Sequence, residues 1–247
     1  DTTLLVIIFP IIIGILVSIF AIIFRLSFET LQLIFFNTSL DNISVRLQDI
    51  PWFIILFVPT IGGLVIGILI YNFMPFGRST GIADLIEINS DHKSDYSIKT
   101  ALKGGIINTL SIGVGASVGR EGPIVHIGGV IGSLFFSKIK KNQNLKPLLI
   151  ACGVASAVSA SFNAPIAGVL FAMEVILKKN SLNTFIPIII SSLIGSVISR
   201  KYFGSAPIFN LVELNFKSFA EIPLFIILGI FCSLIGLIFV NFFSIRV

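Results

Sequence analysis

Residues 113–133 place a charged pair inside an apolar, glycine-rich stretch, GVGASVGREGPIVHIGGVIGS. A charge in the middle of a membrane costs about 2.5–3.5 kcal/mol on insertion scales, so Arg120 and Glu121 are candidates for a functional role. Pro123 suits the first turn of a helix, where its missing N–H would have no partner. The pattern therefore predicts a break in the backbone followed by a helix that begins near Gly122.

The free amides at the start of such a helix favour the binding of anions. Glu121 is then a tethered anion at a place where a diffusible anion can also bind, and Gly119 and Gly122 remove side-chain bulk on either side of it. A second interpretation is structural: Arg120 and Glu121 neutralise each other at a tight crossing of two helices. The residues alone leave both interpretations open.

Composition indicates the class of protein. The chain has 247 residues, of which 55% are hydrophobic and only 12% are charged, whereas a soluble domain carries about 25% charged residues. The long apolar runs show no alternation of apolar and polar residues, which favours helices over a β-barrel. The net charge of +5 is spread over short loops, so it reports membrane topology rather than nucleic-acid binding. We expect an all-α membrane protein.

Apolar spans are expected at four places, residues 4–24, 51–75, 183–203 and 222–245. Residues 147–162 and 165–177 are too short for two ordinary spans, and Asn163-Ala164-Pro165 between them predicts a helix break. Short, broken helices that meet near the midplane are the way in which transporters build ion sites.

Lysines gather in two of the connecting loops, at residues 138–146 and 178–182. The positive-inside rule places both loops on the cytoplasmic side of the membrane. Cysteines introduced at Lys141 and Lys179 should therefore be shielded from impermeant thiol reagents in intact cells. Labelling of both cysteines from outside would refute this orientation.

A hydroxyl side chain occupies a second candidate position, in the segment Ser79-Thr80-Gly81-Ile82-Ala83. Serine and threonine before a helix are common N-caps, which is one role for Thr80. The residues alone favour this role, and it is compatible with a hydroxyl that also faces an ion.

These motifs resemble those of the CLC chloride channel and transporter family. Residues 119–129, GREGP followed by IVHIGG, are similar to the family's glutamate-gate motif, and residues 153–174, GVASAVSASFNAPIAGVLFAME, are similar to its next signature. Residues 79–83 look like a divergent form of the family's glycine-serine-glycine-isoleucine-proline motif, with Thr80 at the serine position. Ser79 replaces the first glycine and Ala83 the proline.

The resemblance implies a bundle of tilted, partly broken transmembrane helices, like one half of the CLC inverted-repeat fold. It makes Glu121 the gate of an anion path. The implied anion-binding residues are Thr80, Gly81, Arg120, Glu121 and Gly122. We expect residues 1–247 to form a single transmembrane domain, the first half of a two-half CLC-type domain, without a soluble domain.

Two neighbouring residues bear on proton coupling. Proton-coupled members of the family have two consecutive glutamates where this chain has Glu174 and Val175. The second glutamate accepts the proton, so the substitution by Val175 weakens the case for coupling without excluding it. Glu174 has a structural alternative as well, an ion pair with Lys178 at the helix end.

The expected function is transport of chloride or a related anion through a glutamate-gated path, by a channel or a transporter. One alternative is a proton-coupled chloride/proton antiporter, and another is a non-transporting membrane subunit or scaffold. The resemblance implies the lipid bilayer, the missing second half and a second copy in a homodimer as partners, in the plasma (inner) membrane of a prokaryote. We expect no enzymatic activity, no cofactor, no metal site and no nucleic-acid partner.

Overall fold

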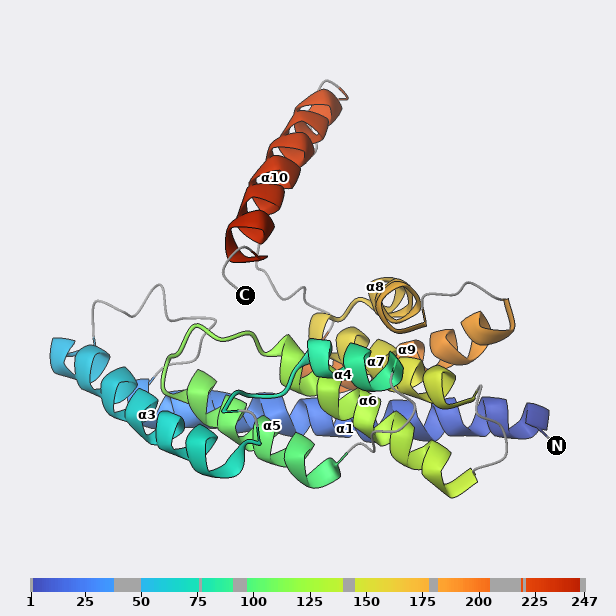
Figure 1. The fold of residues 1–247 in the computed structure, drawn as a ribbon, viewed down its shortest axis with the longest axis horizontal. Coiled ribbons are helices and arrows are strands. Elements are labelled where there is room, and N and C mark those ends of the chain that lie inside the picture. Colours follow the sequence, from blue (N-terminus) through green and yellow to red (C-terminus); the bar gives the residue numbers. More distant parts are fainter. Residues whose placement is uncertain are drawn as a thin grey trace. The chain divides into compact units, whose positions relative to one another are not determined.

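The computed structural model shows an arrangement of helices (Figure 1). It describes residues 2–37, 50–75, 77–90, 97–139, 145–177, 182–204, 219 and 221–244. These ranges contain no β-strand, so the all-α prediction is confirmed for them. The helices are α1 Thr2–Phe36, α3 Trp52–Phe73, α4 Ile82–Ser90, α5 Ile98–Gly113, α6 Glu121–Ile139, α7 Leu145–Phe162, α8 Pro165–Phe171, the π-helix η3 Ala172–Leu177, α9 Leu182–Phe203 and α10 Glu221–Ser244.

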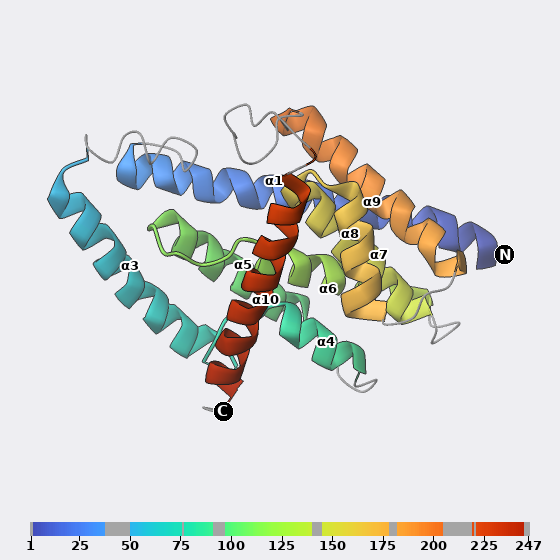
Figure 2. The same ribbon diagram turned by 90° about the horizontal axis from the view of Figure 1, so that it is seen from above.

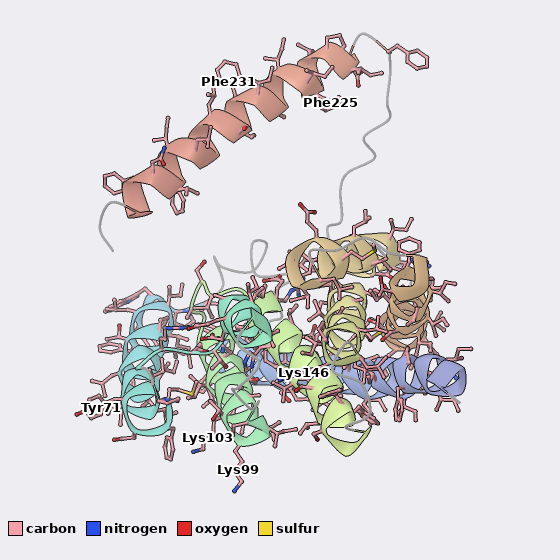
Figure 3. All side chains as sticks on the ribbon, turned by 45° about the vertical axis from the view of Figure 1, so that its right-hand side comes forward. Tyr71, Lys99, Lys103, Lys146, Phe225 and Phe231 are labelled. Atoms are coloured by element: carbon pink, nitrogen blue, oxygen red, sulfur yellow. The ribbon has the colours of Figure 1, made fainter. Side chains whose placement is uncertain are left out.

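Packing divides the chain into two units, Asp1–Ile208 and Phe209–Val247. The first unit holds α1 to α9. The second holds α10, an apolar helix whose side chains, Phe225 and Phe231 among them, project on all sides (Figure 3). Among the described residues, five helices are long and apolar enough to cross a membrane, and they belong to α1, α3, α7, α9 and α10.

Each of the four predicted spans lies in a helix that is long and apolar enough to cross a membrane, but the first of these helices is longer than predicted. Helices α3, α9 and α10 follow their predicted ranges closely, but α1 continues past residue 24 to Phe36. The predicted apolar range stops before Arg25, which is charged, and Glu29 one turn later pairs with it at 2.6 Å between Nε and Oε1. The Arg25 guanidinium also lies 4.1 Å from the centre of the Phe203 ring. Neutralised and covered in this way, Arg25 is accommodated inside the helix.

Helix α7 is the centre of the first unit and packs against α6, α9 and α1 (Figures 1 and 2). Its contact with α6 depends on glycines that bring backbone against backbone. A Cβ atom built on Gly153 would overlap the carbonyl oxygen of Gly128, and one built on Gly132 would overlap that of Leu149. Small residues allow this approach in lipid, where helices associate through close packing.

Serine hydroxyls hold α7 and α9 together. Ser191 of α9 donates to the carbonyl oxygen of Cys152 at 2.8 Å, and Ser199 donates to that of Ala160 at 2.7 Å. In the opposite direction, Ser159 of α7 donates to the carbonyl oxygen of Ser192 at 2.7 Å. These neutral bonds satisfy polar groups that would otherwise be costly inside a membrane.

The break between α7 and α8 lies at the predicted position. Asn163 has a positive φ of 55°, and Pro165 begins α8 in the first turn. The Arg200 side chain of α9 donates to the Asn163 side-chain oxygen, and Ser196 donates to the same oxygen at 3.3 Å. One part of the prediction is corrected, because α7 begins at Leu145 and so reaches 18 residues, enough for a span.

The charged loops of the topology prediction lie largely outside the described part of the chain. Residues 140–144 and 178–181, which include Lys141 and Lys179, belong to the ranges that the structure does not describe. The proposed cytoplasmic side of these loops therefore stays a prediction.

Candidate functional site

The predicted break in the backbone is present between α5 and α6. Helix α5 ends at Gly113, and Gly115 has a φ of +89°, a left-handed conformation that favours glycine. Residues 116–119 are non-helical, and α6 then begins at Glu121 with Pro123 in its first turn. The helix start predicted near Gly122 is thus confirmed, and it places the Glu121 side chain at the N-terminal end of α6, where amides are free.

Glu121 is only loosely paired with its neighbour. The Arg120 Nε atom lies 3.7 Å from Glu121 Oε1, beyond hydrogen-bond distance, and the two side chains are 25% and 35% exposed. The carboxylate lies over Gly119, where an added Cβ would come within 2.9 Å of Glu121 Oε2. A Cβ on Gly122 would meet nothing within 4 Å. Gly119, rather than Gly122, is the glycine that makes room for the carboxylate.

The segment before α4 is held by a carboxylate that the sequence analysis did not single out. Asp84, in the first turn of α4, accepts two hydrogen bonds from the Arg78 guanidinium, at 2.7 and 3.1 Å. It also accepts one from the backbone N–H of Gly81 at 2.7 Å. The Gly81 N–H is therefore already hydrogen-bonded to Asp84 in this structure. The sequence signal for this role of Asp84 is an acidic residue in the first turn of a helix with a cationic residue shortly before it.

Thr80 does not cap α4 in the structure, because that helix begins at Ile82 and the Thr80 hydroxyl has another contact. Its Oγ1 atom lies 3.4 Å from Nδ1 of His126 on α6. The other side of Thr80 rests on α5, where a Cβ added to Gly104 would come within 2.8 Å of Oγ1. The structure thus fits Thr80 between α5 and α6.

The contact with His126 ties the Thr80 loop to the helix that begins at Glu121. At a rise of 1.5 Å per residue, His126 lies about 7.5 Å along the α6 axis from Glu121. Both candidate segments therefore use α6 as a common support. The neighbouring Ser79 is fixed separately, by a hydrogen bond from the Asn108 amide of α5.

The two residues that bear on proton coupling lie in the π-helix η3. Glu174 is exposed, and Val175 is partly buried against the main hydrophobic core. Lys178, the partner that the structural alternative requires for Glu174, lies outside the described residues. That alternative stays a prediction.

The chain matches the model of a known protein family. The family model described as voltage gated chloride channel matches residues 62–245, which is most of the chain. The chain belongs to this family. The match includes the Thr80 segment, the Glu121 helix start and the break before α8, so the CLC resemblance of the motifs is confirmed.

Individual CLC relatives match over most of the chain. Chloride channel protein CLC-e of Arabidopsis thaliana is 34% identical over 197 residues, covering 75% of this chain and 27% of the relative. The voltage-gated ClC-type chloride channel ClcB of Escherichia coli O81 is 31% identical over 232 residues, covering 91% and 54%. The chain thus spans between a quarter and about half the length of these CLC relatives.

Solved structures show the same fold. A slow cyanobacterial Cl⁻/H⁺ antiporter aligns with a TM-score of 0.74 at 24% identity, over 94% of this chain and 54% of the other. A CLC-type fluoride/proton antiporter aligns with a TM-score of 0.63 at 22% identity, over 87% and 51%. The chain therefore has the all-α CLC membrane fold over a part of the length of those proteins, and it is an integral membrane protein.

Proposed function

We propose that this chain is part of a protein that carries chloride or a related anion across a membrane, with Glu121 as the gate. The observation that carries the proposal is the shared use of α6. This helix begins at Glu121, where free amides favour an anion, and it holds the Thr80 hydroxyl through His126. A hydroxyl donor and a helix start are thereby fixed to one rigid element.

Each predicted site residue has a part in this proposal. Thr80 donates its hydroxyl hydrogen to the anion, and the amides at Glu121 and Gly122 provide the positive end of the helix. Gly81 keeps the neighbourhood of Thr80 free of a side chain, since an added Cβ there would meet nothing within 4 Å. Arg120, loosely paired with Glu121, adds positive potential at the place where the carboxylate and the anion compete.

The site needs more than this chain. The chain spans about half of ClcB, and broken-helix backbone is tolerated in a membrane only where protein or water covers it. We therefore propose residues 1–247 as a single transmembrane domain, the first half of a two-half protein, which pairs with a second copy to form a homodimer. The proposed location is the plasma membrane of a prokaryote, and the proposed activity is transport, not enzymatic catalysis.

Proton-coupled exchange is the second candidate, because two of the solved structures that share the fold are described as antiporters. Val175 at the internal proton position favours uncoupled transport, since valine carries no proton. The two are separated by reconstituting the full-length protein in liposomes with a chloride gradient. Proton uptake or release that depends on the chloride gradient supports exchange, and its absence supports a channel.

Replacement of Thr80 by valine tests the anion site. Valine has nearly the same shape but no hydroxyl, so Thr80→Val should weaken chloride binding by about 0.5–1.5 kcal/mol. The measurement is isothermal titration of chloride into the full-length purified protein. A matched control is Thr60→Val, because the Thr60 hydroxyl donates to its own helix, to the Leu56 carbonyl oxygen at 2.6 Å. Equal affinities of the two variants would remove Thr80 from the anion site.

A further inference from the structure

His126 is buried in α6 and has so far appeared only as a support for Thr80. Its side chain is among the buried polar groups, at 4% exposure. The side-chain hydrogen bond that the structure describes for the ring joins Nδ1 to the Thr80 hydroxyl, at 3.4 Å. A buried imidazole in contact with a proposed ion-binding hydroxyl can set the direction of that hydroxyl's hydrogen, which an apolar neighbour cannot do.

The direction of this hydrogen bond decides where the Thr80 hydrogen points. In a neutral imidazole, one ring nitrogen is a donor and the other an acceptor. If Nδ1 is the acceptor, Thr80 donates to His126 and its hydrogen is used there. If Nδ1 carries the hydrogen, Thr80 accepts from His126, and its own hydrogen is free to point elsewhere. An anion requires the second arrangement, because a hydroxyl oxygen without an available hydrogen repels it.

Contacts from α4 and α5 fix the position of Thr80 but not the rotation of its hydroxyl. Gly104 sets how closely the side chain approaches α5, and Asn108 holds the neighbouring Ser79. Asp84 holds the backbone at Gly81. These contacts place Oγ1, whereas the hydroxyl hydrogen can still rotate about the Cβ–Oγ1 bond. Among the described residues, His126 is the side chain at hydrogen-bond distance from Oγ1 that can select the direction of this hydrogen.

We propose that His126 is a positioning residue for the anion site: its Nδ1–H donates to Thr80 Oγ1 and so turns the Thr80 hydroxyl hydrogen toward the anion. This inference rests on the proposed function, in which Thr80 is an anion donor. His126 itself does not touch the anion in this arrangement. Its effect on chloride binding therefore passes through Thr80 alone.

The test compares three replacements of His126 in the full-length protein. Asparagine can place an amide N–H near the position of Nδ1, glutamine places its amide near Nε2, and leucine has no donor. We expect His126→Asn to keep the chloride affinity within about twofold, and His126→Gln and His126→Leu to lower it about three- to tenfold, as loss of one neutral hydrogen bond would. Affinity is measured by isothermal titration of chloride.

A double-mutant cycle with Thr80 separates this inference from the proposed function. When both act through one hydroxyl, His126→Leu should change the affinity less than about twofold in the Thr80→Val background. The inference is overturned if the losses of chloride affinity caused by the two replacements multiply in the double variant. It is also overturned if His126→Asn lowers the chloride affinity as much as His126→Leu does. Either result leaves Thr80 in the anion site. An ineffective Thr80→Val would overturn the Thr80 assignment and this inference with it. If His126→Leu does not fold, the comparison of asparagine with glutamine still decides the question.

Discussion

Replacement of Glu121 by glutamine is expected to leave the anion path open in the full-length protein. Glutamine has nearly the size of glutamate but no charge, so it competes weakly with chloride for the amides at the start of α6. Chloride flux should persist and become largely insensitive to pH, because a glutamine side chain has no ionisable group. Any coupled proton movement should disappear. The measurement is chloride efflux from liposomes at several pH values.

Two further measurements complete this prediction. Glu121→Asp keeps the charge with a shorter reach and should not reproduce the glutamine variant. Folding of each variant is followed by thermal unfolding, because a structural Arg120–Glu121 pair predicts a loss of stability instead of open flux. The 3.7 Å separation, which is beyond hydrogen-bond distance, indicates a weak pair. A glutamine variant that misfolds and gives no flux would contradict the gate.

The largest loss of stability is expected at the contact between α6 and α7. A Cβ added at Gly153 would overlap the Gly128 carbonyl oxygen, and backbone cannot move aside as a flexible side chain can. Gly153→Ala should therefore force the two helices apart and lower the free energy of unfolding by about 3 kcal/mol or more, the upper end of the overpacking range. The measurement is the midpoint of thermal unfolding of the purified full-length protein.

Gly67 of α3 provides the matched control. A Cβ there meets nothing within 4 Å, and alanine is the better helix former by about 0.8–1.0 kcal/mol. Gly67→Ala should thus keep or raise the unfolding midpoint. A Gly153→Ala protein that unfolds at the same temperature as the Gly67→Ala protein would show that the backbones of α6 and α7 are not in contact.

The main features of the fold follow from local sequence signals. Proline and glycine predict the start of α6 near Gly122 and the break before Pro165, because these residues act on the backbone directly. Apolar length predicts α3, α9 and α10. The extent of α1 follows only in part, because Glu29 is a local partner of Arg25 whereas Phe203, which covers its guanidinium, is distant in sequence. A contact between residues so far apart cannot be inferred from the residues around either of them.

The candidate site is predictable in part for the same reason. Glu121 and Thr80 stand in motifs, so their residue types and their neighbours in the sequence are enough to mark them. The partners that position Thr80 come from elsewhere: Asp84 acts on the loop from within α4, and His126 reaches it from α6. In the sequence, His126 is only a polar residue in an apolar stretch, since nothing local relates it to a residue that precedes α5.

The backbone contact at Gly128 and Gly153 has a consequence for how fast the proposed gate can operate. The contact places the Gly128 carbonyl group of α6 directly against Gly153 of α7, so we expect sliding or turning of α6 to be hindered. Helix displacements take microseconds to milliseconds, whereas rotamer changes of exposed side chains take picoseconds to nanoseconds. With α6 held fixed and Glu121 as the proposed gate, we expect opening to be a rotation of the Glu121 side chain. The lifetime of the closed state should then depend on the free energy needed to move the carboxylate away from the N-terminal end of α6.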